Sequence, residues 1–182
     1  MTDNFDFLEL MEKRYSVRRF SDTPIENGTI EKILRAGQVA PTACNNQPQR
    51  ILVINSDEGL KKLRRCTECH FNAPAAMLIC YNNEECWKRS YDGKASGDID
   101  ASIVTTHMML EAASLGVGTT WVMHFIPEAV KCEFKVPDNI EPVAILIMGY
   151  PSSNAKPAPG HSDIKPIGDT VMYNSFDNID KS

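Results

Sequence analysis

The chain has 182 residues and an ordinary composition for a globular protein, with 42% hydrophobic, 24% charged and 8% aromatic residues. Its 19 Lys and Arg against 24 Asp and Glu give a net charge of −5, which argues against a general nucleic-acid or anionic-membrane binder. No segment approaches the roughly 20 apolar residues of a membrane span, and the acidic N-terminus lacks the layout of a signal peptide. We therefore expect one cytoplasmic domain over residues 1–182, with its six cysteines as reduced thiols.

Hydrophobic periodicity predicts five helices and four strands in an irregular order. The helices are expected at 6–15, 25–40, 57–66, 98–116 and 127–134, and the strands at 50–55, 75–82, 117–125 and 141–150. The buried stripe of the second helix is expected to comprise Ile30, Ile33, Leu34 and Val39. From about residue 151 the chain is rich in Pro, Ser, Asn and Asp and is expected to be extended. This arrangement predicts an α+β fold with helices over a mixed sheet.

The longest helical segment, 98–116, is apolar around most of its circumference and is closed by Gly116, which suits the C′ position. Such a helix is expected either in the core of a monomer or at a dimer interface. The dimer is favoured, because the C-terminal tail has too few apolar residues to fold alone and can become ordered on a second subunit. His107, on this helix, is expected to pack in the core.

A basic cluster surrounds one serine in the sequence KRYSVRRF, residues 13–20. Alternate side chains of an extended segment share a face, so Arg14, Ser16 and Arg18 are expected to line one side. Two guanidinium groups with a hydroxyl between them suit a phosphate, because arginine donates bidentate, charge-assisted hydrogen bonds. The alternative is a solvated surface whose arginines pair with neighbouring carboxylates.

A second polar stretch, APTACNNQPQR at residues 40–50, crowds amide side chains into a short loop before a strand. Amides offer both donors and acceptors, and they suit a heterocycle that presents both, such as the pyrimidine edge of a flavin. The alternative is a hydrogen-bonded turn, since asparagine favours turns. The polar residues of this loop are Thr42, Asn45, Asn46, Gln47 and Gln49.

Four blocks in this order resemble the nitroreductase family of FMN-dependent enzymes: RYSVRRF, APTACNNQP, an apolar helix ending LGVGTTWV, and a strand ending MGYP. The resemblance covers roughly residues 8–166. It implies a three-layer α/β/α sandwich, an FMN bound between the subunits of a homodimer, and a tail at about 151–182 that wraps around the partner. It also implies a ping-pong cycle in which NADH or NADPH supplies electrons to nitroaromatic or quinone-like acceptors.

The same resemblance implies roles for the basic cluster. Arg14 and Ser16 would hold the flavin phosphate, and Arg18 would place a positive charge at the pyrimidine edge, where it stabilises the reduced flavin. Tyr15 belongs to the same cofactor-binding stretch. Lys165 is the candidate for the family's late basic residue near the phosphate.

The remaining implied cofactor contacts come from two other stretches. The second subunit would contribute four residues of the loop, Pro41, Thr42, Ala43 and Asn45. Gln47 would support that loop, and backbone amides of Val122, Met123 or His124 would approach flavin N5. Because the cofactor itself carries out hydride transfer, no acid–base pair is required of the protein. His124 is nevertheless a candidate proton donor, since histidine titrates near neutrality.

The polar segment 83–97 occupies the place where members of the family vary and cover the substrate. Trp87 and Tyr91 are expected to form an aromatic lid that stacks on a flat acceptor, the alternative being a surface helix with two half-buried aromatics. Lys88, Arg89 and Lys94 are expected to form a solvated face. Attraction of an anionic donor or substrate is the alternative for these three residues.

The sequence CTECH, residues 66–70, supports rival interpretations. It matches the c-type haem attachment pattern. Cys66, Cys69 and His70 would form a zinc site if Cys80 or Cys86 supplied a fourth ligand. A Cys66–Cys69 redox pair is a further alternative. A flavin-binding or sensor protein that keeps the same fold but lacks nicotinamide turnover is the remaining rival function.

Overall fold

The structure, a computed structural model, describes residues 6–176 and contains every helix and strand predicted above. The helices are α1 (Phe7–Lys13), α2 (Asn27–Gln38), α3 (Asp57–Cys66), α4 (Gly97–Ser114) and α5 (Pro127–Phe134), with a one-turn helix, α6 (Ile167–Thr170), in the tail. The strands are β1 (Gln49–Ile54), β2 (Ala75–Asn82), β3 (Gly118–Val122) and β4 (Ile140–Gly149). Two 3₁₀ turns are η1 (Ala43–Asn45) and η2 (Pro159–Ser162). The predicted tail reaches past residue 176, and that last part lies outside the described residues.

The strands form one sheet in the order β1-β2-β4-β3, and each neighbouring pair is antiparallel. The mixed sheet expected from the sequence is therefore present only through an isolated parallel bridge between Ser16 and Thr119. Pro142, which has no N–H to donate, lies in β4 beyond the part that pairs with β3 and next to a register shift in β2. The fold class is α+β, as predicted.

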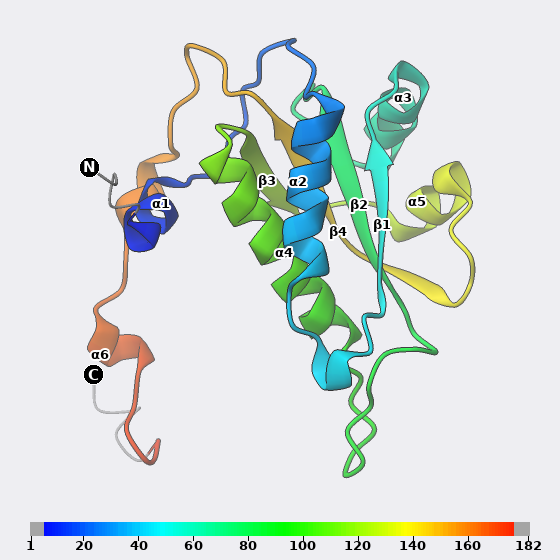
Figure 1. Ribbon diagram of the computed structural model, residues 1–182, viewed down its shortest axis with the longest axis vertical. Coiled ribbons are helices and arrows are strands. Elements are labelled where there is room, and N and C mark those ends of the chain that lie inside the picture. Colours follow the sequence, from blue (N-terminus) through cyan, green and yellow to red (C-terminus); the bar gives the residue numbers. More distant parts are fainter. Residues whose placement is uncertain (1–5, 177–182) are drawn as a thin grey trace.

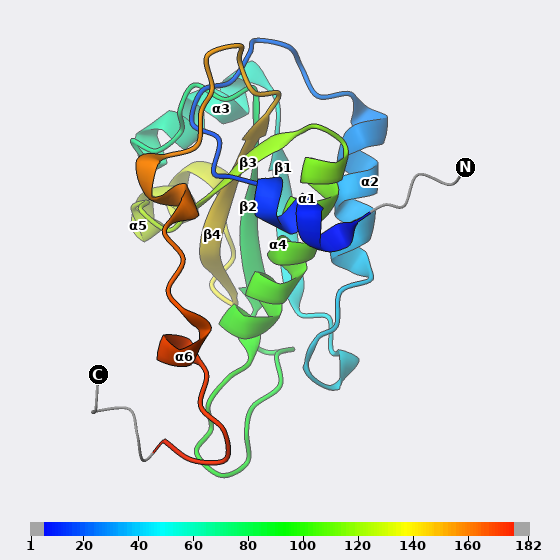
Figure 2. The same cartoon turned by 90° about the vertical axis from the view of Figure 1, so that its left-hand side faces the viewer.

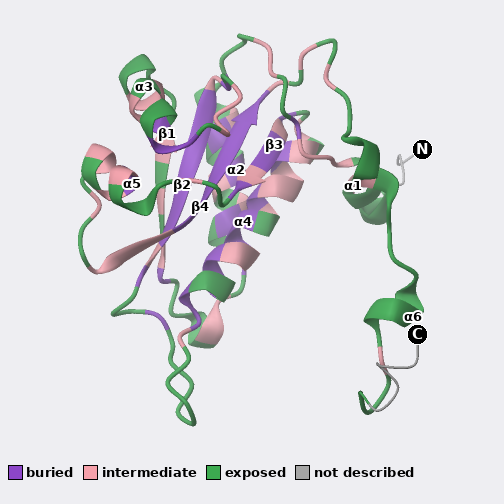
Figure 3. Cartoon of the chain, turned by 180° about the vertical axis from the view of Figure 1, so that it is seen from behind, coloured by how far each residue is buried: buried purple, intermediate pink, exposed green. Residues whose placement is uncertain are grey.

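Helices cover both faces of the sheet, with α2 and α4 on one face and α3 and α5 on the other (Figure 1). The central strands β2 and β4 consequently read as continuous apolar runs, because both of their faces are buried (Figure 3). Alternate residues still separate between the two cores. In β2, Met77 packs toward α2 and α4, while Leu78 packs toward α3 and α5. The three-layer sandwich implied by the family resemblance is confirmed.

Helix α4 crosses the sheet and ends at the predicted glycine. Gly116 follows the last turn with a φ of +74°, a conformation that a residue with a Cβ adopts at a cost. In α2, Ile30 and Ile33 are buried as expected, but Val39 is 60% exposed because the helix ends at Gln38. His107 is half-buried and lines an open groove between α1, α2 and α4, so its expected place in the core is wrong.

Two segments project from the body of the molecule (Figure 2). A hairpin between β2 and α4 is held by an antiparallel bridge between Lys88 and Ala95. The tail after β4 runs away from the sheet through η2 and α6, and most of its residues are exposed (Figures 1 and 3). None of the helices between residues 6 and 176 combines the length and apolar character required to cross a bilayer.

Candidate functional site

The basic segment 14–18 is fastened along the edge strand β3. Val17 donates its N–H to the carbonyl oxygen of Thr119 at 3.0 Å, and its own carbonyl accepts a hydrogen bond from the Thr120 hydroxyl. Val17 is buried, whereas Arg14 and Ser16 are half-buried and Arg18 is exposed. The extended backbone turns Val17 inward and leaves Ser16 and Arg18 more exposed, but Tyr15 is half-buried like Arg14. A single side shared by Arg14, Ser16 and Arg18 therefore stays a prediction.

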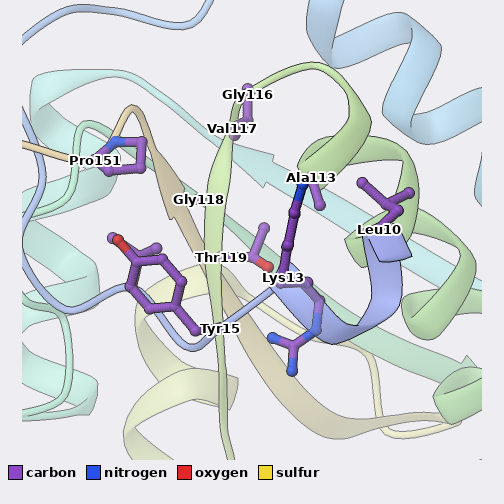
Figure 4. A pocket seen from close by; sticks show the side chains of 11 residues that line it. Leu10, Lys13, Tyr15, Ala113, Gly116, Val117, Gly118, Thr119 and Pro151 are labelled. Carbon is purple, nitrogen blue, oxygen red and sulfur yellow. The ribbon is translucent and has the colours of Figure 1, made fainter. Parts of the chain in front are cut away.

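Arg14 lies at a small cavity of about 170 Å³ between α1, the end of α4 and the start of β3 (Figure 4). Lys13, Tyr15 and Thr119 are among the other lining residues. One guanidinium nitrogen of Arg14, Nη1, is buried and has no hydrogen-bond partner among the described residues. A buried guanidinium without an acceptor is costly, so this nitrogen indicates a place where an anion belongs.

Gly118 allows the basic segment to lie this close to β3. A Cβ at Gly118 would lie 2.5 Å from Val17 Cγ2, well inside van der Waals contact. The second glycine of LGVGTTWV is therefore required by packing, whereas the first, Gly116, is required by its φ angle.

The loop 41–47 is anchored at the other end of α4. Asp100, in the first turns of that helix, is only 2% exposed. Its Oδ1 accepts a hydrogen bond from the backbone N–H of Ala43 at 2.8 Å, and its Oδ2 accepts one from the Ser96 hydroxyl at 2.7 Å. The buried carboxylate is thereby satisfied, and it fixes the loop to the helix.

Contacts within the loop hold an unusual backbone. Cys44, Asn45 and Gln47 have φ angles of 52°, 55° and 51°, which non-glycine residues seldom adopt. Gln47 donates its backbone N–H to the hydroxyl oxygen of Thr42 at 3.0 Å, and its side-chain amide donates to the carbonyl of Asn45 at 3.4 Å. Gln47 thus supports the loop, as the resemblance implied. Pro41 and Asn45 are exposed, and Ala43 is half-buried.

The two polar regions do not meet within one chain. The cavity at Arg14 touches Ala113, near the end of α4, while the loop is bonded to Asp100 near its start. A helix rises about 1.5 Å per residue, so these two positions are separated by about 20 Å. The two regions therefore lie toward opposite ends of α4 in one chain.

The end of β3 presents the third predicted element. Val122 is buried, but Met123 and His124 are exposed, and neither of their backbone N–H groups donates a hydrogen bond to another described residue. The carbonyl of His124 accepts a hydrogen bond from the Thr67 hydroxyl at 2.5 Å. Ile126 donates its N–H to the carbonyl of Cys66 at 2.8 Å. Two hydrogen bonds therefore tie the strand end to the CTECH turn, and the N–H groups of Met123 and His124 have no partner among the described residues.

The projecting hairpin carries the predicted lid residues. Tyr91, at its tip, is 94% exposed, and Trp87, at its base, is 39% exposed. Arg89 forms an ion pair with Asp92 that raises the pKa of the guanidinium and lowers that of the carboxyl. The surface helix considered from the sequence is wrong, because 88–95 is a hairpin. The lid itself stays a prediction.

The tail passes the basic segment at Tyr15, whose ring lies edge-on to that of His161 with centroids 6.1 Å apart. Lys165 follows in an exposed stretch and makes no hydrogen bond or ion pair with another described residue. Its predicted contact with a phosphate stays a prediction.

The CTECH residues do not form the metal site considered from the sequence. Among residues 6–176, no three His, Cys, Asp or Glu side chains are grouped so as to hold a metal ion. All six cysteines are free thiols. Burial raises the pKa of Cys80 to about 12 and also raises that of Cys66, so both disfavour the thiolate that zinc requires. Burial, and to a smaller extent the nearby positive charge of Arg64, lowers the pKa of His70.

Two site residues were not found from the sequence. Asp100 is the second aspartate of DID, the acidic start of the apolar helix, and only its burial and its hydrogen bond to Ala43 identify it as the anchor of the loop. Thr67 lies inside CTECH, where the cysteines drew attention to metal binding. No sequence signal connects Thr67 with His124.

Comparisons with known proteins agree with this geometry. A crystal structure of a nitroreductase family protein from Clostridium difficile 630 superposes with a TM-score of 0.89 at 42% identity, covering 94% of this chain and 99% of that one. An FMN-dependent nitroreductase from Clostridium difficile R20291 gives a TM-score of 0.77 at 27% identity, covering 93% and 99%.

A protein of Archaeoglobus fulgidus, named as a putative NADH dehydrogenase/NAD(P)H nitroreductase, is 32% identical over an alignment 151 residues long that covers 79% of this chain and 84% of that one. The model of the nitroreductase family matches residues 11–74 and 68–150. These matches include the basic segment, the loop, α4 and the end of β3. The chain therefore belongs to the nitroreductase family.

Proposed function

We propose that this protein is an FMN-dependent oxidoreductase that takes electrons from NADH or NADPH. The observation that carries the proposal is the buried Arg14 Nη1 without an acceptor at the cavity beside β3. A phosphate would supply that acceptor, and the guanidinium geometry matches it. Two relatives described above support the same assignment: one is titled an FMN-dependent nitroreductase, and the other carries NAD(P)H nitroreductase in its name.

The size of the cavity indicates how FMN would lie. About 170 Å³ suits a phosphate-sized group and falls below the 300–1,000 Å³ of sites that enclose whole cofactors. The flavin ring would therefore lie outside this cavity. Arg18, two residues beyond Ser16, would meet its pyrimidine edge.

The protein would act as a homodimer with FMN between the subunits. Asp100, which holds the loop 41–47, and Ala113, which lines the Arg14 cavity, are about 20 Å apart along α4, so the loop that covers the ring would come from the partner. Apolar side chains that one chain leaves exposed favour such an interface. They are Phe7, Leu8 and Met11 on α1, Ile99 on α4, and Ile164, Ile167 and Tyr173 in the tail.

When bound, FMN supplies the redox chemistry, accepting a hydride from the donor and passing electrons to the acceptor. The chain's own residues bind and orient it. Arg14 and Ser16 hold the phosphate, and the free N–H groups of Met123 and His124 are the donors available for N5. Donor and acceptor use the same open face in turn, a ping-pong cycle that suits flat nitroaromatic or quinone-like acceptors beneath Trp87 and Tyr91.

The six free thiols fit a reducing compartment such as the cytoplasm.

The test is an absorption spectrum of the purified protein, followed by anaerobic addition of NADH and, separately, NADPH. Flavin bands that bleach with either donor and return with a quinone are the expected result. Flavin bands that do not bleach would instead identify a flavin-binding or sensor protein. A protein without flavin after incubation with FMN would contradict the proposal.

A further inference from the structure

A second cavity lies beyond the basic segment, between it and the start of the tail. Its volume is about 390 Å³, and it is lined by Arg18, Arg19, Asn154, Lys156, Pro157 and Ala158. None of these residues lines the Arg14 cavity, so the structure divides the basic segment between two cavities. The second one is the larger and the more polar.

The three cations of this cavity are not neutralised. Arg18, Arg19 and Lys156 form no ion pair with a carboxylate anywhere in residues 6–176, and no acidic side chain lines the cavity. The one hydrogen bond of their side chains runs from Arg18 Nη1 to the carbonyl of Ser16 at 3.2 Å. By contrast, Arg50 forms a bidentate pair with Glu85 at 2.7 and 2.6 Å. In a protein of net charge −5, three uncompensated cations in one cavity favour an anion.

The backbone that carries these groups is fixed in place. Ser152 donates its N–H to the carbonyl of Arg19 at 3.0 Å, and an antiparallel bridge joins Phe20 to Pro151. The Ser152 hydroxyl donates to Asn154 Oδ1 at 2.7 Å. This bond uses the amide oxygen of Asn154 and leaves its NH₂ available as a further donor. A ligand would therefore meet a preorganised set of donors.

We infer that this cavity binds the diphosphate of the nicotinamide donor, an inference that rests on the proposed function. The diphosphate of a dinucleotide carries two negative charges, which the three cations can neutralise, and it needs more room than the single phosphate proposed at Arg14. Arg18 also favours this ligand. It lines this cavity and is the residue proposed to meet the pyrimidine edge of the flavin, so a diphosphate held here would bring the nicotinamide end of the donor toward that ring. Nitroaromatic and quinone-like acceptors carry no phosphate, so the three cations would not be needed to bind them.

The test compares a charged donor with a neutral one. Arg19→Gln combined with Lys156→Gln removes two cations and leaves Arg18 and the flavin contacts intact. With a quinone as acceptor, the KM for NADH or NADPH should rise by about tenfold, because two charge-assisted contacts are lost at a partly solvated site. The KM for 1-benzyl-1,4-dihydronicotinamide, which carries no phosphate, should not change. Lys32→Gln with Lys61→Gln, which removes two exposed lysines that form no ion pair within residues 6–176, should alter neither value.

The remaining outcomes separate this inference from the proposed function. An unchanged KM for the dinucleotide, or an equal rise for both donors, overturns the inference while the enzyme still turns over. A calorimetric titration with inorganic pyrophosphate provides a readout that does not depend on flavin. Binding by the wild type that is lost in the double variant supports the cavity, even if the protein held no FMN and the proposed function failed. Absence of pyrophosphate binding by the wild type overturns it.

Discussion

Thr67 Oγ1 donates a hydrogen bond of 2.5 Å to the carbonyl oxygen of His124, across 57 residues of sequence. The same oxygen accepts the N–H of Cys69 at 3.0 Å, so one buried hydroxyl joins the CTECH turn to the end of β3. CTECH therefore has a structural explanation that involves no metal.

Replacing Thr67 with valine keeps the shape of the side chain and removes both hydrogen bonds. Thr67→Val should lower the free energy of unfolding by about 1–3 kcal/mol, because two hydrogen bonds at partly buried groups, each worth about 0.5–1.5 kcal/mol, are lost. Urea denaturation measures this loss. Thr67→Ser keeps the hydroxyl and should retain most of the stability; an equal loss in both variants would mean that packing of the methyl group, and not the hydrogen bonds, stabilises the turn.

Gly118→Ala tests the close approach of the basic segment to β3. The added methyl group would lie 2.5 Å from Val17 Cγ2, so the segment must shift. We expect a loss of about 1–3 kcal/mol in stability and weaker FMN binding. Gly28→Ala is the matched control, since a Cβ there meets nothing within 4 Å and should leave stability unchanged or slightly raised. Full FMN affinity in Gly118→Ala would show that the segment's position does not matter for the cofactor.

Arg14→Ala should weaken FMN binding. Loss of a hydrogen bond to a charged group costs about 1.5–3 kcal/mol, which corresponds to roughly a 10- to 150-fold rise in Kd. Fluorescence titration of the flavin-free protein with FMN measures the change. Arg19→Gln provides the control, because Arg19 lines the other cavity and its loss should leave FMN affinity unchanged. Equal affinities of wild type and Arg14→Ala would refute the phosphate assignment.

Asp100→Ala should release the loop 41–47. The substitution removes the acceptor of the Ala43 N–H and of the Ser96 hydroxyl, both hydrogen bonds to a charged group, and should cost at least about 2 kcal/mol. Asp100→Asn keeps one acceptor oxygen and should cost less. Limited proteolysis at the loop reports its release directly. A loop that stays protected in Asp100→Ala would indicate that its internal contacts suffice.

Because burial raises the pKa of the Cys80 thiol, we predict that the folded protein loses stability at alkaline pH. Its pKa is raised to about 12 in the folded protein by burial in β2, whereas an unfolded thiol titrates near 8.5. The stabilising contribution is therefore complete below about pH 8.5 and is lost as the pH rises toward 12, at up to about 1.4 kcal/mol per pH unit. Denaturation midpoints between pH 8.5 and 10.5 should fall more steeply for the wild type than for Cys80→Val. Parallel slopes would show that Cys80 does not titrate in this way.

The apolar pattern was sufficient to locate the helices and strands. Segments 57–66, 75–82 and 127–134 were predicted with the bounds that the structure has, because each is bounded by a clear local signal. Pro127 at N1 of α5 is one such signal. Val39 was misassigned to the buried stripe because the 3.6-residue pattern does not show where a helix ends.

Pairing between distant segments could not be predicted in the same way. The prediction of a mixed sheet was wrong for β1 to β4, which all pair antiparallel. An alternation of helices and strands does not specify strand direction when both faces of the sheet are covered. The buried Asp100 and the Thr67–His124 hydrogen bond join segments 57 residues apart, and each is visible only once burial is known.

By itself, the sequence determined the family and the order of the elements, since these depend on short motifs and on local spacing. Only the tertiary structure decided that Arg14 Nη1 is buried without an acceptor, and that Arg18 and Arg19 face a different cavity with Lys156. It also decided that the two polar regions lie at opposite ends of α4. The physical reason is that burial and separation depend on how the chain packs across the sheet, and no local pattern of residues encodes that packing.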